Sequence, residues 1–284
     1  VLITNSIGGT DTNDRRQSDV TALLTGPQTL TLTRVTSGNQ SIVEYMIAEF
    51  VSGVTVVSNT TTLLGVATQV NITLPQSFDL TRSFPTVTAR SSTSNFDTDQ
   101  YNMFTAELTT PTNLQLARGA SAAGYDVTLA YQVIGFDLAE ADPAKVDVVV
   151  QKSPVGNPPR SNNVVDATAG EAADIAADAY ISTLDVNLPT PVDPARSFLV
   201  FSTGAPAGMD GWEDTYPVDG TFRNCAPTCS QLRFFRQWGG VAPFDVWMPW
   251  SVITFKDQAY SQNFRTTVTT ESDVPTNQTL SSTP

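Results

Sequence analysis

The chain has 284 residues, of which 40% are hydrophobic and 15% are charged, so it is long and apolar enough to bury a core. Fifteen basic and 28 acidic residues give a formal net charge of −13, and a surface of that sign repels phosphate backbones, so we expect no nucleic-acid partner. The absence of histidine removes the commonest general base and metal ligand, and we expect no enzymatic activity. No apolar run approaches the roughly 20 residues of a membrane-spanning helix.

A five-residue pattern occurs three times in the chain and indicates tandem units. Its copies are Leu30–Arg34, Leu114–Arg118 and Leu232–Arg236, which read LTLTR, LQLAR and LRFFR. A strand-like run follows each copy and ends in an apolar-rich hexapeptide, at 45–50, 131–136 and 250–255. Internal repeats of this kind are typical of structural units that follow one another along a chain.

Longer matches give the expected boundaries of these units. Residues 20–30 match 104–114 without a gap, and 222–232 repeats that length with diverged residues. Asp193–Phe198 repeats the Asp-x-x-Arg-Ser-Phe pattern of Asp79–Phe84. We therefore expect units at 1–50, 51–136 and 137–255. The last unit carries an insertion at 153–182, in which the Ala- and Asp-rich stretch 166–180 could form a short helix.

The pattern inside the units is typical of β-strands. Val127, Leu129, Tyr131 and Val133 alternate with less apolar residues, which places one apolar face on a strand with a period of two. Thr, Val and Ile suit half-buried strands, and clusters of Gly, Pro, Asn and Asp suit turns. We expect an all-β fold of three tandem antiparallel β-sandwich repeats of immunoglobulin- or jelly-roll-like type.

The first unit is expected to be incomplete. The equivalent of Phe84 would fall at position 0, so the front of this unit is missing, while residues 256–284 follow the third unit as a tail. Within that tail, Asn277–Leu280 resembles Asn71–Leu74. A sandwich that lacks strands exposes its core and unpaired backbone groups, so other strands must complete it.

Three arrangements fit these ends. The tail could return to the first unit of its own chain, so that three units close into a pseudo-threefold ring. It could instead complete the first unit of another copy as a donor strand, and such a head-to-tail contact generates a filament because it does not close. Thirdly, the chain could be a piece of a longer repeat array, and its ends would then indicate nothing about assembly. We expect the second arrangement, with 256–284 as a donor-strand tail.

Cys225 and Cys229 are the two cysteines of the chain. A zinc site needs about four ligands, and the chain has neither a second cysteine pair nor a histidine. The pair lies where the other units have a turn, so we favour a disulfide that closes this turn, in an oxidising compartment, over free thiols.

Acidic side chains recur in one loop of each unit. They are Asp11 and Asp14, then Asp97 and Asp99, and then Asp210, Glu213 and Asp214. Calcium prefers clustered carboxylates, which makes Asp97, Asp99, Asp210 and Asp214 candidate calcium ligands. Asp also favours turns, and no loop has the full EF-hand spacing, so we prefer the turn-forming role and expect no other cofactor.

Arg34, Arg118 and Arg236 each end the repeated motif. A recurring Arg could bind a carboxylate or a sugar, but its presence in every unit favours a folding role, with the guanidinium at the sandwich edge and the stem on the core. Trp212 and Trp238 fall in expected loops, where an aromatic side chain is a candidate contact for a partner or a glycan.

The order of motifs in residues 79–136 resembles the H-type lectin family. The motifs are a Phe-Pro-x-Val strand at 84–87, an Asp-bearing loop and an aromatic-containing last strand at 131–136. The resemblance implies a sugar-binding β-sandwich, although the first two units lack the family's Trp in the final strand, and no binding residues are carried over. Such repeats also look like parts of phage fibres and bacterial surface appendages.

Two functions follow as expectations. The first is an extracellular structural subunit of a surface filament, pilus-like fibre or virion appendage that forms a homopolymer by β-strand exchange between copies. The second is a carbohydrate-binding adhesin on a cell or virion surface, whose acidic and Trp-bearing loops contact glycans.

Overall fold

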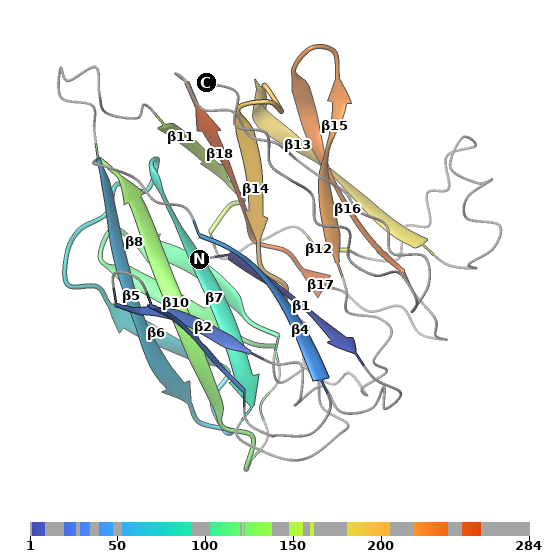
Figure 1. The fold of residues 1–284 in the computed structure, drawn as a ribbon. Helices are drawn as coiled ribbons and strands as arrows, with labels where there is room; N and C mark the ends of the chain where they lie inside the picture. The colour runs from blue at the N-terminus through green and yellow to red at the C-terminus, as the bar shows by residue number, and fades with distance from the viewer. Residues whose placement is uncertain are drawn as a thin grey trace.

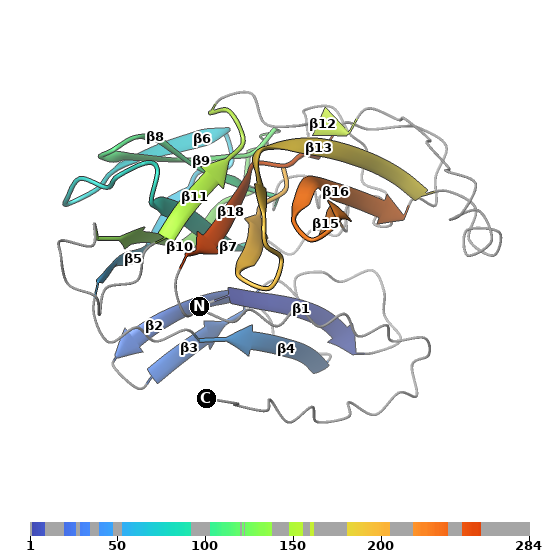
Figure 2. The same cartoon turned by 90° about the horizontal axis from the view of Figure 1, so that it is seen from above.

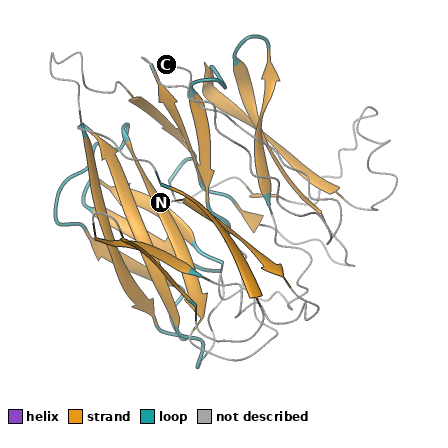
Figure 3. Cartoon of the chain, viewed as in Figure 1, coloured by secondary structure: helices purple, strands orange, loops and turns teal. Residues whose placement is uncertain are grey.

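The computed structural model describes residues 2–8, 20–26, 29–34, 40–47, 53–91, 103–119, 121, 123–137, 148–155, 160–161, 181–204, 218–237 and 246–256. In these ranges every regular element is a β-strand and every strand pair is antiparallel, which confirms the all-β prediction for this part of the chain (Figures 1 and 3). Among the same residues there is no helix with the length and hydropathy to span a bilayer. The helix considered at 166–180 lies outside the described residues.

The strands follow one another along the chain as three groups. We call β1–β4 the first unit, β5–β10 the second unit and β11–β18 the third unit. Their bounds are β1 (Leu2–Gly8), β2 (Thr21–Gly26), β3 (Thr29–Thr33), β4 (Gln40–Met46), β5 (Val54–Leu63), β6 (Gln69–Thr73), β7 (Ser83–Ser91), β8 (Thr105–Thr110), β9 (Asn113–Ala117), β10 (Val127–Phe136), β11 (Val148–Lys152), β12 (Arg160–Ser161), β13 (Ile181–Val192), β14 (Ser197–Phe201), β15 (Asp219–Cys225), β16 (Cys229–Gln237), β17 (Val246–Trp247) and β18 (Trp250–Phe255).

The second unit consists of two three-stranded sheets that share one core. Their strand orders are β5-β10-β7 and β6-β9-β8. Leu114 and Leu116 of β9 and Leu129 of β10 are 0% exposed and belong to one apolar cluster, so the two sheets face each other across it. The period-two alternation of β9 places both leucines on that inner face, because successive side chains of a strand point to opposite sides.

The third unit repeats this arrangement strand for strand. Its larger sheets have the orders β11-β18-β14 and β13-β16-β15, and their shared cluster includes Leu232, Phe234, Trp250 and Val252. The third unit also contains a short β12-β17 pair. Trp250 is 4% exposed and takes the position of Tyr131 in the core.

Among the described residues, the first unit contains the counterparts of four of these six strands. β1 pairs with β4 as β7 pairs with β10, and β2 pairs with β3 as β8 pairs with β9. The hairpin register is the same, because Ala22 lies opposite Leu32 where Ala106 lies opposite Leu116. A register shift also falls at the same place in both hairpins, so the ungapped match of 20–30 with 104–114 reflects one local structure.

The match of 222–232 with 104–114 was wrong in register. Leu108 lies opposite Leu114 in the second unit, and Phe222 lies opposite Leu232 in the third. These pairs are 6 and 10 residues apart in sequence (114 − 108 and 232 − 222), so the third hairpin is four residues longer. The equal lengths in sequence hid this extension, because it lengthens the far end of the hairpin, where the pairing continues to Cys225 and Cys229, and the strand before it has diverged.

A third apolar cluster joins the second unit to the third. It lies between the outer faces of the sheets β5-β10-β7 and β11-β18-β14, and four phenylalanines form its centre. The rings of Phe84 and Phe198 are 6.1 Å apart, and those of Phe136 and Phe255 are 6.0 Å apart. Figure 2 shows these two sheets close together, with the blue strands of the first unit below them.

Candidate functional site

Two strand edges of the first unit are unpaired among the described residues. β4 pairs with β1 alone, whereas its counterparts β10 and β18 each pair with two strands. β3 pairs with β2 alone, whereas β9 and β16 each have partners on both edges. Both open edges correspond to the positions of β5 and β6 in the second unit. An open edge presents a row of unpaired N–H and C=O groups, which is a template for an added strand.

Leucines of the same hairpin are exposed where their equivalents form a core. Leu24 is 38% exposed and Leu32 is 39% exposed, whereas Leu108 is 2% and Leu116 is 0% exposed at the matching positions of the second unit. The repeated sequence therefore places leucines for a core that the described strands do not complete. The open edges and these leucines together make the first unit the candidate site.

Buried and exposed residues lie side by side in the β2–β3 hairpin, since Leu32, which is 39% exposed, lies opposite Ala22. Val20 and Ala22 are each 4% exposed, on the same face as Leu24 by the alternation of the strand. β2 contacts β5, β7 and β10 of the second unit, and the Ala22 N–H donates a hydrogen bond to the Thr88 hydroxyl over 3.3 Å. Within the described residues, the hairpin is thus buried at Val20 and Ala22 of β2 and exposed at Leu24 and Leu32.

Arg118 has the structural role that its recurrence predicted. Its guanidinium is buried, at 1% exposure for the residue, and donates to the backbone carbonyls of Leu64, Gly65, Ala67 and Tyr125 over 2.9–3.1 Å. The group also lies 5.9 Å from the centre of the Phe104 ring. Every one of these partners belongs to the unit's own framework, so this Arg joins loops at the end of the second unit.

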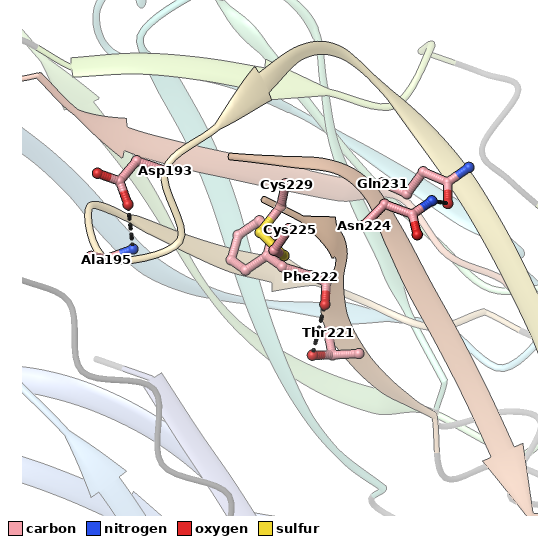
Figure 4. Close-up of a disulfide and its surroundings, with 8 residues drawn as sticks. All are labelled: Asp193, Ala195, Thr221, Phe222, Asn224, Cys225, Cys229 and Gln231. Carbon is pink, nitrogen blue, oxygen red and sulfur yellow. Dashed lines mark hydrogen bonds between the residues drawn. A yellow bond between two sulfur atoms is a disulfide. The ribbon is translucent and has the colours of Figure 1, made fainter. Parts of the chain in front are cut away.

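Cys225 and Cys229 form a disulfide at the tip of the β15–β16 hairpin (Figure 4). Cys229 is 0% exposed and packs in the core of the third unit, while Cys225 is exposed. The turn between them contains a cis Ala226–Pro227 bond, and Asn224, with φ of 52°, donates to the Gln231 side chain. The disulfide therefore fastens the longer turn of this hairpin to the core.

The other predicted site residues lie outside the described residues. They are Trp212, Trp238, Asp11, Asp14, Asp97, Asp99, Asp210, Glu213 and Asp214. The glycan and calcium sites therefore stay predictions. Within the described ranges, no three His, Cys, Asp or Glu side chains come together as a metal site.

Sequence reasoning missed Lys152, at the end of β11. This side chain lines a cavity between the second and third units, together with Glu107, Ser202 and Trp250. Burial lowers the pKa of its amine to about 8, and the carboxylate of Asp79 acts in the opposite direction. Periodicity could not reveal this environment, because it forms only where two units meet.

Searches with the whole chain found no matching family model, no matching curated protein and no matching solved structure. The resemblance to H-type lectins therefore stays a prediction based on its motifs.

Proposed function

We propose that this chain is a structural subunit of an extracellular filament or surface appendage, assembled by β-strand exchange. In this proposal each six-stranded unit is a β-sandwich, and the first unit is a sandwich that lacks two strands. Residues 257–284 of a neighbouring copy supply them. The observation that carries the proposal is the pair of open edges on β3 and β4 beside exposed leucines whose equivalents are buried.

The tail segment Asn277–Leu280 is the donor candidate for the edge of β3. It resembles Asn71–Leu74, and β6, which contains Asn71, pairs with β9 so that Ile72 lies opposite Leu114. A donor strand in the same register would lie opposite Leu30, the counterpart of Leu114 in the first unit. Added strands of this kind bind through the backbone ladder, and alternate side chains give the specificity.

The free energy gained by burying the exposed leucines is too small to account for the binding of a donor strand. Leu24 and Leu32 are 38% and 39% exposed, so completing their burial contributes roughly 1 kcal/mol each. A micromolar complex needs about 8 kcal/mol. Most of the binding free energy must therefore come from the backbone ladder and from donor side chains such as Leu280.

The disulfide and the charge are consistent with this proposal. A disulfide persists in oxidising, extracellular surroundings. The net charge of −13 makes copies repel each other, and salt screens that repulsion over about 10 Å at 0.1 M. Polymerisation should therefore be faster at 0.15 M salt than at 0.01 M salt.

In this proposal the groove is the place for added strands beside the open edges of β3 and β4, next to Leu24 and Leu32, and a substitution there tests the proposal. Leu32→Glu places a charge where a donor strand must pack, so we expect a folded monomer that no longer polymerises. Val66→Glu is the matched control, because Val66 is 70% exposed on the second unit, away from the open edges, and this variant should polymerise like the wild type. Sedimentation velocity and negative-stain microscopy measure the outcome. Equal polymerisation of both variants, or a wild type that stays monomeric, would overturn the proposal.

Removal of the tail shows whether exchange occurs between copies. A chain that ends at Lys256 should be monomeric and should bind a synthetic 257–284 peptide, because its groove is empty. The same peptide should shorten wild-type filaments by competing for the groove at their growing ends. A truncated chain that does not bind the peptide contradicts the proposed donor.

A further inference from the structure

One contact between neighbouring units occurs twice in the structure. The Ala22 N–H of the first unit donates to the Thr88 hydroxyl of the second, over 3.3 Å. The Ala106 N–H of the second unit donates to the Ser202 hydroxyl of the third, over 3.2 Å. Ala22 and Ala106 are equivalent in their hairpins, being opposite Leu32 and Leu116.

The two acceptor hydroxyls are equivalent as well. Thr88 follows Val87, the partner of Tyr131, and Ser202 follows Phe201, the partner of Trp250. The first unit is therefore placed on the second much as the second is placed on the third. In both cases the amide belongs to an edge strand, β2 or β8, and the hydroxyl lies in or directly after an edge strand of the next unit's sheet, β7 or β14.

This contact has a direction, which rules out a twofold relation between the second and third units. A twofold axis would make the contact reciprocal, so that the edge of β15 lay on Thr88. That place is occupied by β2, which contacts β5, β7 and β10. The relation that repeats along the chain is heterologous, and it either closes into a ring or continues as a helix.

The phenylalanine cluster indicates that the relation is nearly a pure rotation. Phe84 and Phe198 are equivalent and 6.1 Å apart, and Phe136 and Phe255 are equivalent and 6.0 Å apart. Every point advances equally along the axis of a screw, so the advance per unit is at most 6.0 Å. A strand such as β10, with 10 residues, is about 33 Å long. So small an advance winds the units around a common centre, as Figure 2 shows, rather than stacking them in a column.

We propose that the third unit closes on the first unit of the same chain through a third copy of this contact. The donor is the Gly220 N–H of β15, since Gly220 lies opposite Phe234 as Ala106 lies opposite Leu116. By register, the position equivalent to Thr88 and Ser202 in the first unit is Thr4 of β1, since Thr4 follows Ile3, the partner of Tyr45. The outer face of β1–β4 is thus the docking surface for the β15 edge, and the three units form a ring. This ring does not depend on strand exchange, which concerns the tail alone.

Cysteine pairs test the contact directly. Gly204 approaches Thr105 closely, since a Cβ added at Gly204 would lie 2.8 Å from Thr105 Cγ2. By the same registers, Thr21 and Arg90 are the equivalent pair between the first and second units, and Asp219 and Ser6 are the pair predicted between the third and first. We expect Ser6→Cys with Asp219→Cys to form an intrachain disulfide in the monomer. The control pair, Thr21→Cys with Arg90→Cys, should form one as well.

Non-reducing gels and peptide mass spectrometry distinguish the outcomes. A monomer with faster mobility and a mapped 6–219 bond supports the ring. A ladder of linked chains would show that the contact lies between copies, and no bond at 6–219 while the 21–90 control forms would show that the contact is absent. Either result overturns the proposal.

Amide hydrogen exchange of the unmodified protein gives a second measurement that needs no cysteine variant. The amides of Ala22, Ala106 and Gly220 should all exchange at least 100-fold more slowly than the exposed turn amide of Thr228. Fast exchange at Gly220 beside slow exchange at Ala22 and Ala106 would also overturn the ring. The chain that ends at Lys256 should keep this protection, so failure of strand exchange and failure of the ring are distinguishable.

Discussion

Two polar side chains, the buried Arg118 and the half-buried Asp126, fix the ends of strands in the second unit. Arg118 joins the 64–67 loop to Tyr125, and the Asp126 carboxylate accepts the Gly65 N–H over 2.7 Å. These bonds satisfy backbone groups that no strand partner reaches. A buried group of this kind is costly to remove, because its partners then lose their hydrogen bonds without gaining water.

We predict that Arg118→Met lowers the free energy of unfolding by about 3–5 kcal/mol, since four carbonyls lose a buried cationic donor. Urea denaturation measures the change. Arg196→Met is the control, because the Arg196 side chain is 51% exposed beside Asp193 and such pairs contribute about 0–1 kcal/mol. Equal effects of the two substitutions would contradict the structural role of Arg118.

Lys152 should give the stability of the protein a dependence on alkaline pH. Burial lowers its pKa from 10.5 to about 8, so between these values the unfolded chain binds more protons than the folded chain. The free energy of unfolding therefore rises as the pH increases through this window.

Lys152→Met removes the titrating group. The unfolding free energy of the variant minus that of the wild type should therefore fall as the pH rises from 8 to 10, because only the wild type gains stability from this group over that range. Taking this difference cancels the titration of the other groups. Denaturation curves at half-unit pH intervals provide the measurement, and a difference that is constant over this range would show that the amine is not buried.

At the scale of elements, the three hairpins show what the repeat conserves and what it changes. β2–β3 and β8–β9 have the same register and the same irregularity, whereas β15–β16 has a longer turn closed by Cys225 and Cys229. A longer connection costs more conformational entropy to close on folding. A disulfide across it restricts the unfolded chain and so reduces that entropy cost.

We expect the double variant Cys225→Ala and Cys229→Ala to lose about 2 kcal/mol of stability, the value for a loop of about five residues in the chain-entropy model. The midpoint of urea denaturation measures it. Wild-type protein reduced with dithiothreitol should shift by a similar amount, and an unchanged midpoint in both would mean that the turn does not depend on its disulfide.

At the scale of the whole molecule, apolar contacts join the second and third units. The cluster of Phe84, Phe136, Phe198 and Phe255 lies on the outer faces of two sheets, which would otherwise face water. Aromatic rings at centroid distances near 6 Å stabilise a contact by more than the burial of their apolar area alone.

Phe84→Ala should lower the stability by about 3–5 kcal/mol and should also split one calorimetric transition into two, because it weakens the contact between the units. Phe104→Ala is the matched control, since Phe104 is 4% exposed against 5% for Phe84 but lies within the core of the second unit. The control should be destabilised with its single transition retained. Two transitions in both variants would contradict the coupling role of the cluster.

The sequence by itself determined the local structure. The alternation in 127–133 predicted the inner face of β10, and the ungapped match of 20–30 with 104–114 predicted two hairpins of one register. These features follow from a period of two and from turn chemistry, which act over a few residues and leave a direct pattern.

Only the tertiary structure decided how the units meet. Nothing local marks the contact of Ala22 with Thr88, 66 residues apart, or the burial of Lys152 between two units. The outer face of a strand reads as mildly polar whether water or another sheet covers it. Such contacts depend on the relative placement of whole units, and this placement results from many weak interactions between residues far apart in the chain.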